Sequence, residues 1–477
     1  MQKHHTKKGK IIIISIIRIF HITPITNIKV QLETKNNIFI YKKMIRYLIK
    51  ATNKICKPRR QEQTSIFGNI FTRNVTYSDD GKPVFDINVD HTKSRVYVWG
   101  DHKNGKLGYY GEETEGFTPS KIHVLDTLQV SGISCGAEHS VAVNNDGKVM
   151  TWGLGEKFRL GHGEEESEGS PRLVEGLQHE HVISVTCGEQ YTAALTENGD
   201  VYTWGDDSGR LFSSSGVLGH GNFDPQPYPK LIEAFREEDV RIVQIAGGKG
   251  HMVALDEHGG VWTWGKGEYG RLGNGEVGNV PTPEPVELFE EIPVKFVNSG
   301  EHHSCAIDDE GQVWLWGRNE RGQLGIGGGL TMDMYCIESF PTELAANEDE
   351  HEVNELDGVY VGCGTTNSIM IADNNEVYAW GSGGWLAPHR MSVLSQKNVW
   401  KAECGGGTFY AITTDGEMYT WSKSGFMGNS KALGHGKGGF NSQVAQPTLV
   451  EAFKEQNLHV IDVAVGKNHA MAIVQEL

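Results

Sequence analysis

The stretch CGAEHSVAVNNDGKVMTWG, residues 135–153, occurs several times along the chain in closely related form. CGEQYTAALTENGDVYTWG begins at Cys187, and GGKGHMVALDEHGGVWTWG begins at Gly247. In each copy, two runs of strand length with alternating or β-branched residues flank a polar turn that ends in glycine. Asn, Asp and Gly tolerate the left-handed backbone that a tight turn needs. Each copy is therefore predicted to form a β-hairpin.

Two markers count the copies. A tryptophan ends the second strand at Trp99, Trp152, Trp204, Trp264, Trp316, Trp380 and Trp421. A glycine opens the first strand, in a Gly-x-x-His or similar segment, at Gly136, Gly188, Gly248, Gly300, Gly364, Gly405 and Gly466. Most of the tryptophans are followed by a glycine-flanked leucine, as in RLGHG at 159–163. A period of about 50 residues with four short strands predicts an all-β chain folded as a seven-bladed β-propeller.

The two ends of the repeat complement each other. The last Gly-x-x-His strand, around 469–474, has no second hairpin strand after it, and the first tryptophan strand, RVYVWG at 95–100, has no partner before it. Pairing these segments would close the ring and remove two exposed sheet edges. One unit departs from the pattern, because WLAPHRM at 385–391 lacks the usual glycines. An irregular blade is expected there.

Hairpins of the form CGAEHSVAV and TWG, joined by segments such as RLGHG, resemble the repeat of the regulator of chromosome condensation family. The resemblance covers about residues 84–477 and includes all seven units. It implies the same fold as the repeat count, a seven-bladed propeller. The family includes a mitochondrial branch of exchange factor-like proteins, to which this chain is also similar.

The net charge of −17 hides a basic N-terminal segment. Residues 1–61 contain 15 Lys and Arg but one acid, Glu33, whereas the rest of the chain is strongly acidic. Residues 1–83 are expected to be a basic, disordered extension or targeting segment. MIRYLIKATNKICKPRR, from Met44, has an amphipathic basic pattern and indicates a mitochondrial presequence within 44–76. The alternative is a basic tail that binds nucleic acid or nothing.

These residues leave open whether translation starts at Met1 or Met44. The apolar run IIIISII at 11–17 is too short to span a bilayer, so no transmembrane segment is expected. The predicted location is the mitochondrion, with cytoplasm or nucleus as alternatives.

No pattern of catalytic residues stands out, and no cofactor or metal is expected. His139, His251, His303 and His469 occupy one repeated slot on separate blades, which favours bonding to neighbouring backbone between blades over metal binding. Four of the seven cysteines precede the repeat glycines and there is no CxxC pair, so these thiols are predicted to be small buried side chains.

The resemblance implies one activity, guanine-nucleotide exchange on the small GTPase Ran, through a wedge inserted after the third tryptophan strand. GDDSGRLFSSSGVLGHG at 205–221 is longer than its counterpart at 153–163. The wedge candidates are Asp206, Asp207, Arg210, Leu211 and Phe212. The alternative is a longer surface loop.

Glu189 and His469 match the family's polar contact positions, and they complete the set of predicted GTPase contacts. At two further positions, where the family has an acid and a histidine, this chain has Gly250 and Asn367. The sequence therefore leaves open whether exchange activity is kept.

The sequence favours a monomeric protein-binding propeller, a guanine-nucleotide exchange factor-like regulator of a small or dynamin-type GTPase. Exchange makes no covalent bond, so whether the chain is an enzyme stays open. One alternative is a non-catalytic scaffold in organelle RNA or ribosome assembly, or in another regulatory complex. Another is a chromatin-associated Ran exchange factor. Nucleic acid would be bound only through the basic tail, if the mature protein keeps it.

Overall fold

The computed structural model describes residues 93–109, 116–206, 215–327, 357–422, 430–436 and 444–476, and the backbone alone of strands at 74–77, 83–86 and 337–343. Contacts divide the chain into residues 1–66 and 67–477. Apart from the backbone of 74–77 and 83, the predicted presequence, 44–76, and the 1–83 extension lie outside the described residues. Within the described part of the chain, no helix is long and apolar enough to cross a membrane.

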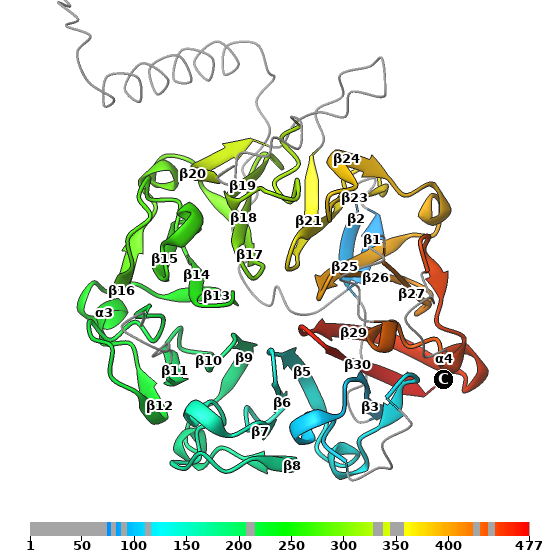
Figure 1. Cartoon of the computed structure of the whole chain (residues 1–477), viewed down its shortest axis with the longest axis horizontal. Coiled ribbons are helices and arrows are strands. Elements are labelled where there is room, and N and C mark those ends of the chain that lie inside the picture. The colour runs from blue at the N-terminus through cyan, green and yellow to red at the C-terminus, as the bar shows by residue number, and fades with distance from the viewer. Residues whose placement is uncertain are drawn as a thin grey trace, which may run out of the picture. The chain divides into compact units, whose positions relative to one another are not determined.

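Seven four-stranded antiparallel sheets stand around a central axis as the blades of a propeller (Figure 1). Blade 1 contains β5 (Val130–Cys135), β6 (His139–Asn144), β7 (Val149–Gly153) and β8 (Glu168–Leu173). Blade 2 contains β9 (Val182–Cys187), β10 (Tyr191–Thr196), β11 (Val201–Gly205) and β12 (Gln226–Leu231). Blade 3 contains β13 (Ile242–Gly247), β14 (His251–Asp256), β15 (Val261–Gly265) and β16 (Val280–Pro285).

The remaining blades follow the same order. Blade 4 contains β17 (Val294–Ser299), β18 (His303–Asp308), β19 (Val313–Arg318) and β20 (Ile337–Glu343). Blade 5 contains β21 (Gly358–Cys363), β22 (Asn367–Ala372), β23 (Val377–Gly381) and β24 (Trp385–Arg390). Blade 6 contains β25 (Val399–Gly405), β26 (Thr408–Thr413), β27 (Met418–Trp421) and β28 (Thr448–Leu449). Short helices α3 (Glu233–Glu237) and α4 (Glu451–Glu455) lie between blades, and β1 (Asn74–Tyr77) pairs with β2 (Pro83–Asp86).

The predicted ring closure is confirmed. Blade 7 joins the two ends of the propeller, in the order β29 (Leu458–Val465), β30 (His469–Glu476), β3 (Ser94–Gly100) and β4 (Ser120–Lys121). β3 and β30 are antiparallel, with Ser94 opposite Gln475 and Gly100 opposite His469. Because every blade thus has a neighbour on both sides, the ring presents no open face of a terminal blade.

The seven repeat tryptophans are the largest fully buried side chains of the core. Six of them donate their indole N–H across a blade junction to the carbonyl of the residue before the repeat leucine; Trp152, for example, bonds to the Lys106 carbonyl at 3.0 Å. The glycine after that leucine has a steric role. Gly108 has φ +71°, and a β-carbon there would lie 2.8 Å from the indole nitrogen of Trp152. The Leu-Gly segments are therefore docking sites for tryptophan.

The repeated histidines bond blades together, as predicted. His469 Nε2 lies 2.8 Å from the hydroxyl of Ser140 on blade 1, and that hydroxyl donates to the Lys106 carbonyl at 2.9 Å. The hydroxyl must then accept from the histidine, which makes His469 a neutral Nε2–H tautomer. His139, His251 and His303 make the same contact to Thr192, Ser304 and Ser368 at 2.9 Å. The partner is a side-chain hydroxyl rather than the backbone itself.

The expectation of an irregular blade at 385–391 is wrong. β24 pairs with β23 as the fourth strand of blade 5, and its register shift has counterparts in other blades. The absence of a Leu-Gly segment from blade 5 affects the neighbouring blade 6. Trp421 would dock on that segment, and its buried indole N–H has no hydrogen-bond partner among the described residues.

Candidate protein-binding face

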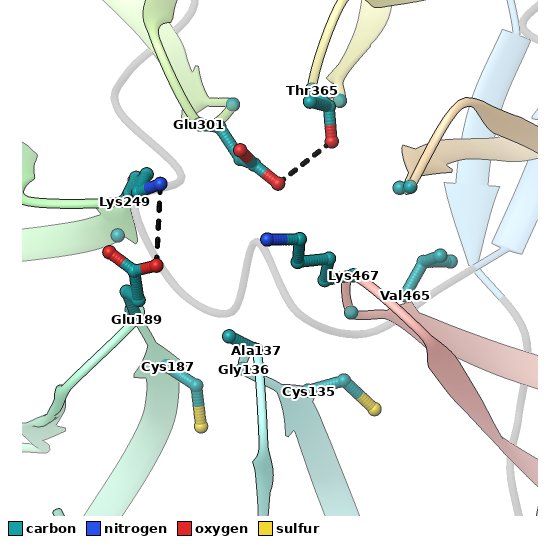
Figure 2. A pocket seen from close by; sticks show the side chains of 18 of the residues that line it. Cys135, Gly136, Ala137, Cys187, Glu189, Lys249, Glu301, Thr365, Val465 and Lys467 are labelled. Atoms are coloured by element: carbon teal, nitrogen blue, oxygen red, sulfur yellow. Dashed lines mark hydrogen bonds and ion pairs between the residues drawn. The ribbon is translucent and has the colours of Figure 1, made fainter. Parts of the chain in front are cut away.

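The Gly-x-x-His loops meet around an opening at one end of the propeller axis (Figure 2). The residue after each repeat glycine lines this central opening: Ala137, Glu189, Lys249, Glu301, Thr365, Gly406 and Lys467. The loops place these residues there because the preceding strand is the innermost of its blade and ends at the axis. We call the end of the propeller that carries these loops the loop face.

The charges around the central opening are unevenly distributed. Glu189 and Lys249 form an ion pair of 3.3 Å, and Glu301 accepts a hydrogen bond of 2.9 Å from Thr365. Lys467 is exposed, and its ammonium group reaches toward the middle of the opening (Figure 2). Ala137 and Gly406 bring no charge. Polar contacts are therefore concentrated on blades 2 to 5, with Lys467 facing them.

Both ends of the insertion after the third tryptophan strand lie on the loop face. The Asp206 N–H donates to the carbonyl of Gln190, the residue next to Glu189, at 3.2 Å. At the other end, Ser215 Oγ is 3.7 Å from the position that a β-carbon on Gly250 would take. The insertion thus leaves and re-enters the fold between the Gly-x-x-His loops of blades 2 and 3.

Behind the opening, a second hollow follows the axis between the innermost strands. Its polar wall comes from blades 5, 6 and 7. Lys401 bonds to Asp462 and lies 3.9 Å from Glu403, which accepts a bond from the hydroxyl of Tyr360. Burial raises the pKa of Glu403 against the opposing charge of Lys401. The cluster links three blades and contains no nucleophile–base pair, so we assign it a role in holding the ring together.

Residues 95–472 match the family described as RCC1-like domain, over most of the chain. The chain belongs to the RCC1-like domain family. The resemblance predicted from the repeat is thereby confirmed, and so is the propeller.

RCC1-like relatives differ greatly in length. Human E3 ubiquitin-protein ligase HERC2 is 30% identical over 397 residues, which is 79% of this chain but 8% of HERC2. The Arabidopsis thaliana RCC1 domain-containing protein RUG3, mitochondrial, is 28% identical over 433 residues, 82% of this chain and 90% of RUG3. The crystal structure of Prp20p from Saccharomyces cerevisiae superposes with a TM-score of 0.68 at 22% identity, over 82% of this chain and 95% of that one. These comparisons support a protein-binding regulator with an RCC1-like propeller.

The RCC1-like fold brings only some of the predicted contact residues to the loop face. Glu189 lines the central opening. Asp206 is buried, 5% exposed, and bonds to Lys157 at 2.8 Å, so it anchors the insertion instead of facing solvent. Asp207, Arg210, Leu211 and Phe212 lie outside the described residues.

His469 does not fit the role of a GTPase contact. Its side chain has no exposed surface, and Nε2 is bonded to Ser140. Burial, reinforced by nearby Lys106, lowers its pKa to about 3, as expected for a structural imidazole that stays neutral. A partner could reach His469 only by opening the blade junction. We therefore no longer count His469 among the candidate contacts.

One group on this RCC1-like face was not predicted from the sequence. Tyr269, on the loop after β15, lies against Arg271 of its own loop and Arg318 of blade 4. A comparison of equivalent slots would have found it, because Tyr269 stands where blade 1 has Lys157 and blade 7 has Asn104.

Proposed function

We propose that this chain is an exchange factor-like regulator that binds a small or dynamin-type GTPase through the loop face. Exchange needs a surface that binds the nucleotide-free GTPase better than the loaded one. The observation that carries the proposal is the position of the insertion. Its described ends, Asp206 and Ser215, lie beside the loops that carry Glu189 and Gly250.

The charges of the loop face support recognition of a protein surface. Glu189 and Lys249 are each about one-third exposed, and their pairing is weak enough to be exchanged for contacts with a partner. The insertion would be the wedge, with Arg210, Leu211 and Phe212 as its contact residues. The propeller itself acts as a rigid monomeric scaffold that holds these groups in place.

The test is release of a fluorescent guanine nucleotide from a panel of GTPases that includes Gsp1p, which Prp20p binds. We expect the full chain to accelerate release from one member, and deletion of 207–214 to abolish the acceleration. The matched control replaces the exposed acidic residues 164–166 on the corresponding loop of blade 1 with Gly and Ser. The proposal is refuted if nucleotide release is accelerated from no GTPase of the panel, or if the deletion leaves the acceleration unchanged.

A substitution at Gly250 tests the proposal by gain of function. A β-carbon there would meet no heavy atom closer than Lys266 Cβ at 3.6 Å, an ordinary contact, so Gly250→Asp fits without rearrangement. It restores an acid at the position where the resemblance implies one. If family-type contacts are used, the variant gains exchange activity on a Ran-type GTPase. The unchanged release rate of a stably folded Gly250→Asp protein would argue for a different mode of binding.

A second candidate is a scaffold without exchange activity in mitochondrial RNA or ribosome assembly. The similarity to RUG3 over nearly its whole length favours a mitochondrial location, in line with the basic pattern at 44–76. N-terminal sequencing of the mature protein tests this location. A start near residues 62–80 supports import and cleavage, whereas an intact basic tail supports a cytoplasmic or nuclear protein, including the chromatin-associated alternative.

A further inference from the structure

The junction between blades 3 and 4 carries a group of aromatic and basic side chains on the loop face. Tyr269 projects from a turn with φ +65°, a left-handed conformation that is unusual for an aromatic residue. The guanidinium carbon of Arg271 is 5.4 Å from the centre of its ring, and that of Arg318 is 4.7 Å away. The His302 ring packs edge-to-face at 5.6 Å. We call Tyr269, Arg271, His302 and Arg318 the Tyr269 cluster.

Equivalent slots at other junctions contain opposite charges. In blade 1, the residue at the Tyr269 position is Lys157, and it bonds at 2.8 Å to Asp206, which occupies the Arg318 position of blade 2. In blade 7, the residue at the Arg271 position is Lys106, and it bonds at 2.6 Å to Glu138, which occupies the His302 position of blade 1. Blade 4 therefore has Arg318 where blade 2 has Asp206, and His302 where blade 1 has Glu138.

The basic groups of the Tyr269 cluster are incompletely paired. Arg271 is fully buried; its Nε donates to the Glu268 carbonyl at 2.7 Å, and the Glu268 carboxylate lies no closer than 3.6 Å. That carboxylate bonds instead to Lys266, at 2.7 Å. Among the described residues, Arg271 Nη2, Arg318 Nε and His302 Nδ1 have no hydrogen-bond partner.

The formal charges at the junction nearly balance. Lys266, Arg271 and Arg318 have two neighbouring carboxylates, Glu268 and Glu320. A third acid, Glu301, accepts from Thr365 at the central opening and also lies 3.8 Å from His302 Nε2. Burial, followed by the charges of Arg271, Lys249 and Arg318, lowers the pKa of His302 to about 2. His302 therefore stays neutral beside three cations and three carboxylates, and what the junction offers a ligand is the set of arginine donors that lack a hydrogen-bond partner among the described residues.

We propose that the Tyr269 cluster binds an aspartate or glutamate side chain of a partner protein. Arg318 and Lys266 are partly exposed and supply the hydrogen-bond donors within reach of a carboxylate. Arg271 is buried beneath them, and its positive charge also attracts the carboxylate. Tyrosine and arginine are the residue types that dominate binding energy at protein interfaces. The proposal does not require the partner to be a GTPase.

The test uses the full chain and a fluorescein-labelled peptide that contains four Asp and Glu residues separated by Gly. Its counterpart has Asn and Gln at the same positions. Fluorescence anisotropy at low salt should show that the acidic peptide binds about tenfold more tightly than the amide peptide. Arg318→Gln and Tyr269→Ala should each remove most of this preference. Equal binding of the two peptides to the wild type overturns the proposal.

A matched control separates the site from general charge effects. Arg236 is also a surface arginine paired with a carboxylate, Asp200 at 2.7 Å, but it lies on helix α3 away from the cluster. Arg236→Gln should leave peptide binding unchanged, and an equal loss in Arg236→Gln and Arg318→Gln refutes a specific site. Inorganic phosphate is the competitor. If phosphate displaces a bound probe while the acidic and amide peptides bind alike, the site recognises phosphate and the proposal fails.

Discussion

Acidification should destabilise the propeller through its buried histidines. His139, His251 and His469 are fully buried, and each bonds to a hydroxyl group of the next blade. Burial is the main cause that lowers their pKa values, to about 3 for His469 and well below the usual value for the other two. They therefore stay neutral in the folded protein at a pH where they are protonated in the unfolded chain.

The sign and size of the effect follow from proton linkage. Below pH about 6.5 the unfolded chain binds one more proton per histidine than the folded one, so the free energy of unfolding falls as pH falls. Each histidine contributes about 1.4 kcal/mol per pH unit until its folded-state pKa is reached. The three together remove about 4 kcal/mol between pH 7.5 and 5.5, a large part of a typical stability of about 5–15 kcal/mol.

The assay is urea unfolding between pH 7.5 and 5.5, followed by the fluorescence of the buried tryptophans. The decisive variant is His469→Asn, because Asn367 already occupies this slot in blade 5, where its amide donates to the Thr408 carbonyl at 3.3 Å. The variant should be less stable at pH 7.5, and the gap to wild type should shrink by about 1.4 kcal/mol at pH 5.5. A gap that stays constant over this range would show that His469 is not the titrating group and would refute the reasoning.

Two further predictions concern the ring. Ending the chain after Asn468 removes β30, whose ladder to β3 closes the propeller, together with buried Met471 and Ile473, each worth about 2 kcal/mol. We expect loss of the cooperative unfolding transition and aggregation in size-exclusion chromatography; a soluble, cooperatively unfolding product would contradict closure by this strand. Trp421→Phe should lower the free energy of unfolding by about 1 kcal/mol less than Trp204→Phe does, because, of these two residues, only Trp204 donates an indole hydrogen bond. Urea unfolding measures both losses, and equal losses would refute the docking of tryptophan on the Leu-Gly segments.

The fold was predictable because its signals are local and repeat. A tryptophan that must reach a carbonyl across a junction, and a glycine that must leave room for it, recur in nearly every unit, so seven markers give seven blades. Ring closure followed from the unpaired strands around 95–100 and 469–474. The error at 385–391 has a related cause. Glycines mark the docking site for the next tryptophan and are not required for β24 to pair with β23.

The candidate site was only partly predictable, because neighbouring residues of one loop face different surroundings. In the loop before β10, Glu189 faces the central opening, whereas the residue that starts each following strand points into the junction, as His469 does. A repeat pattern identifies both positions but not which of them is accessible. Asp206 was predicted as a wedge residue, but it is buried because it bonds to Lys157, which lies on another blade. The sequence gives no periodic signal for such pairs.

Function in a ring of repeats must lie where the repeats differ, because the shared residues are committed to the fold. The docked tryptophans and bonded histidines recur around the ring and are buried. The insertion between β11 and β12, the Glu189–Lys249 pair and the Tyr269 cluster each occur once, and the described ends of the insertion, the pair and the cluster lie on the loop face of blades 2 to 4. One partner seated there would contact all three, so variants at Tyr269 and in 207–214 should weaken its binding in a coupled, non-additive way. Additive effects would mean that the wedge and the cluster serve different partners.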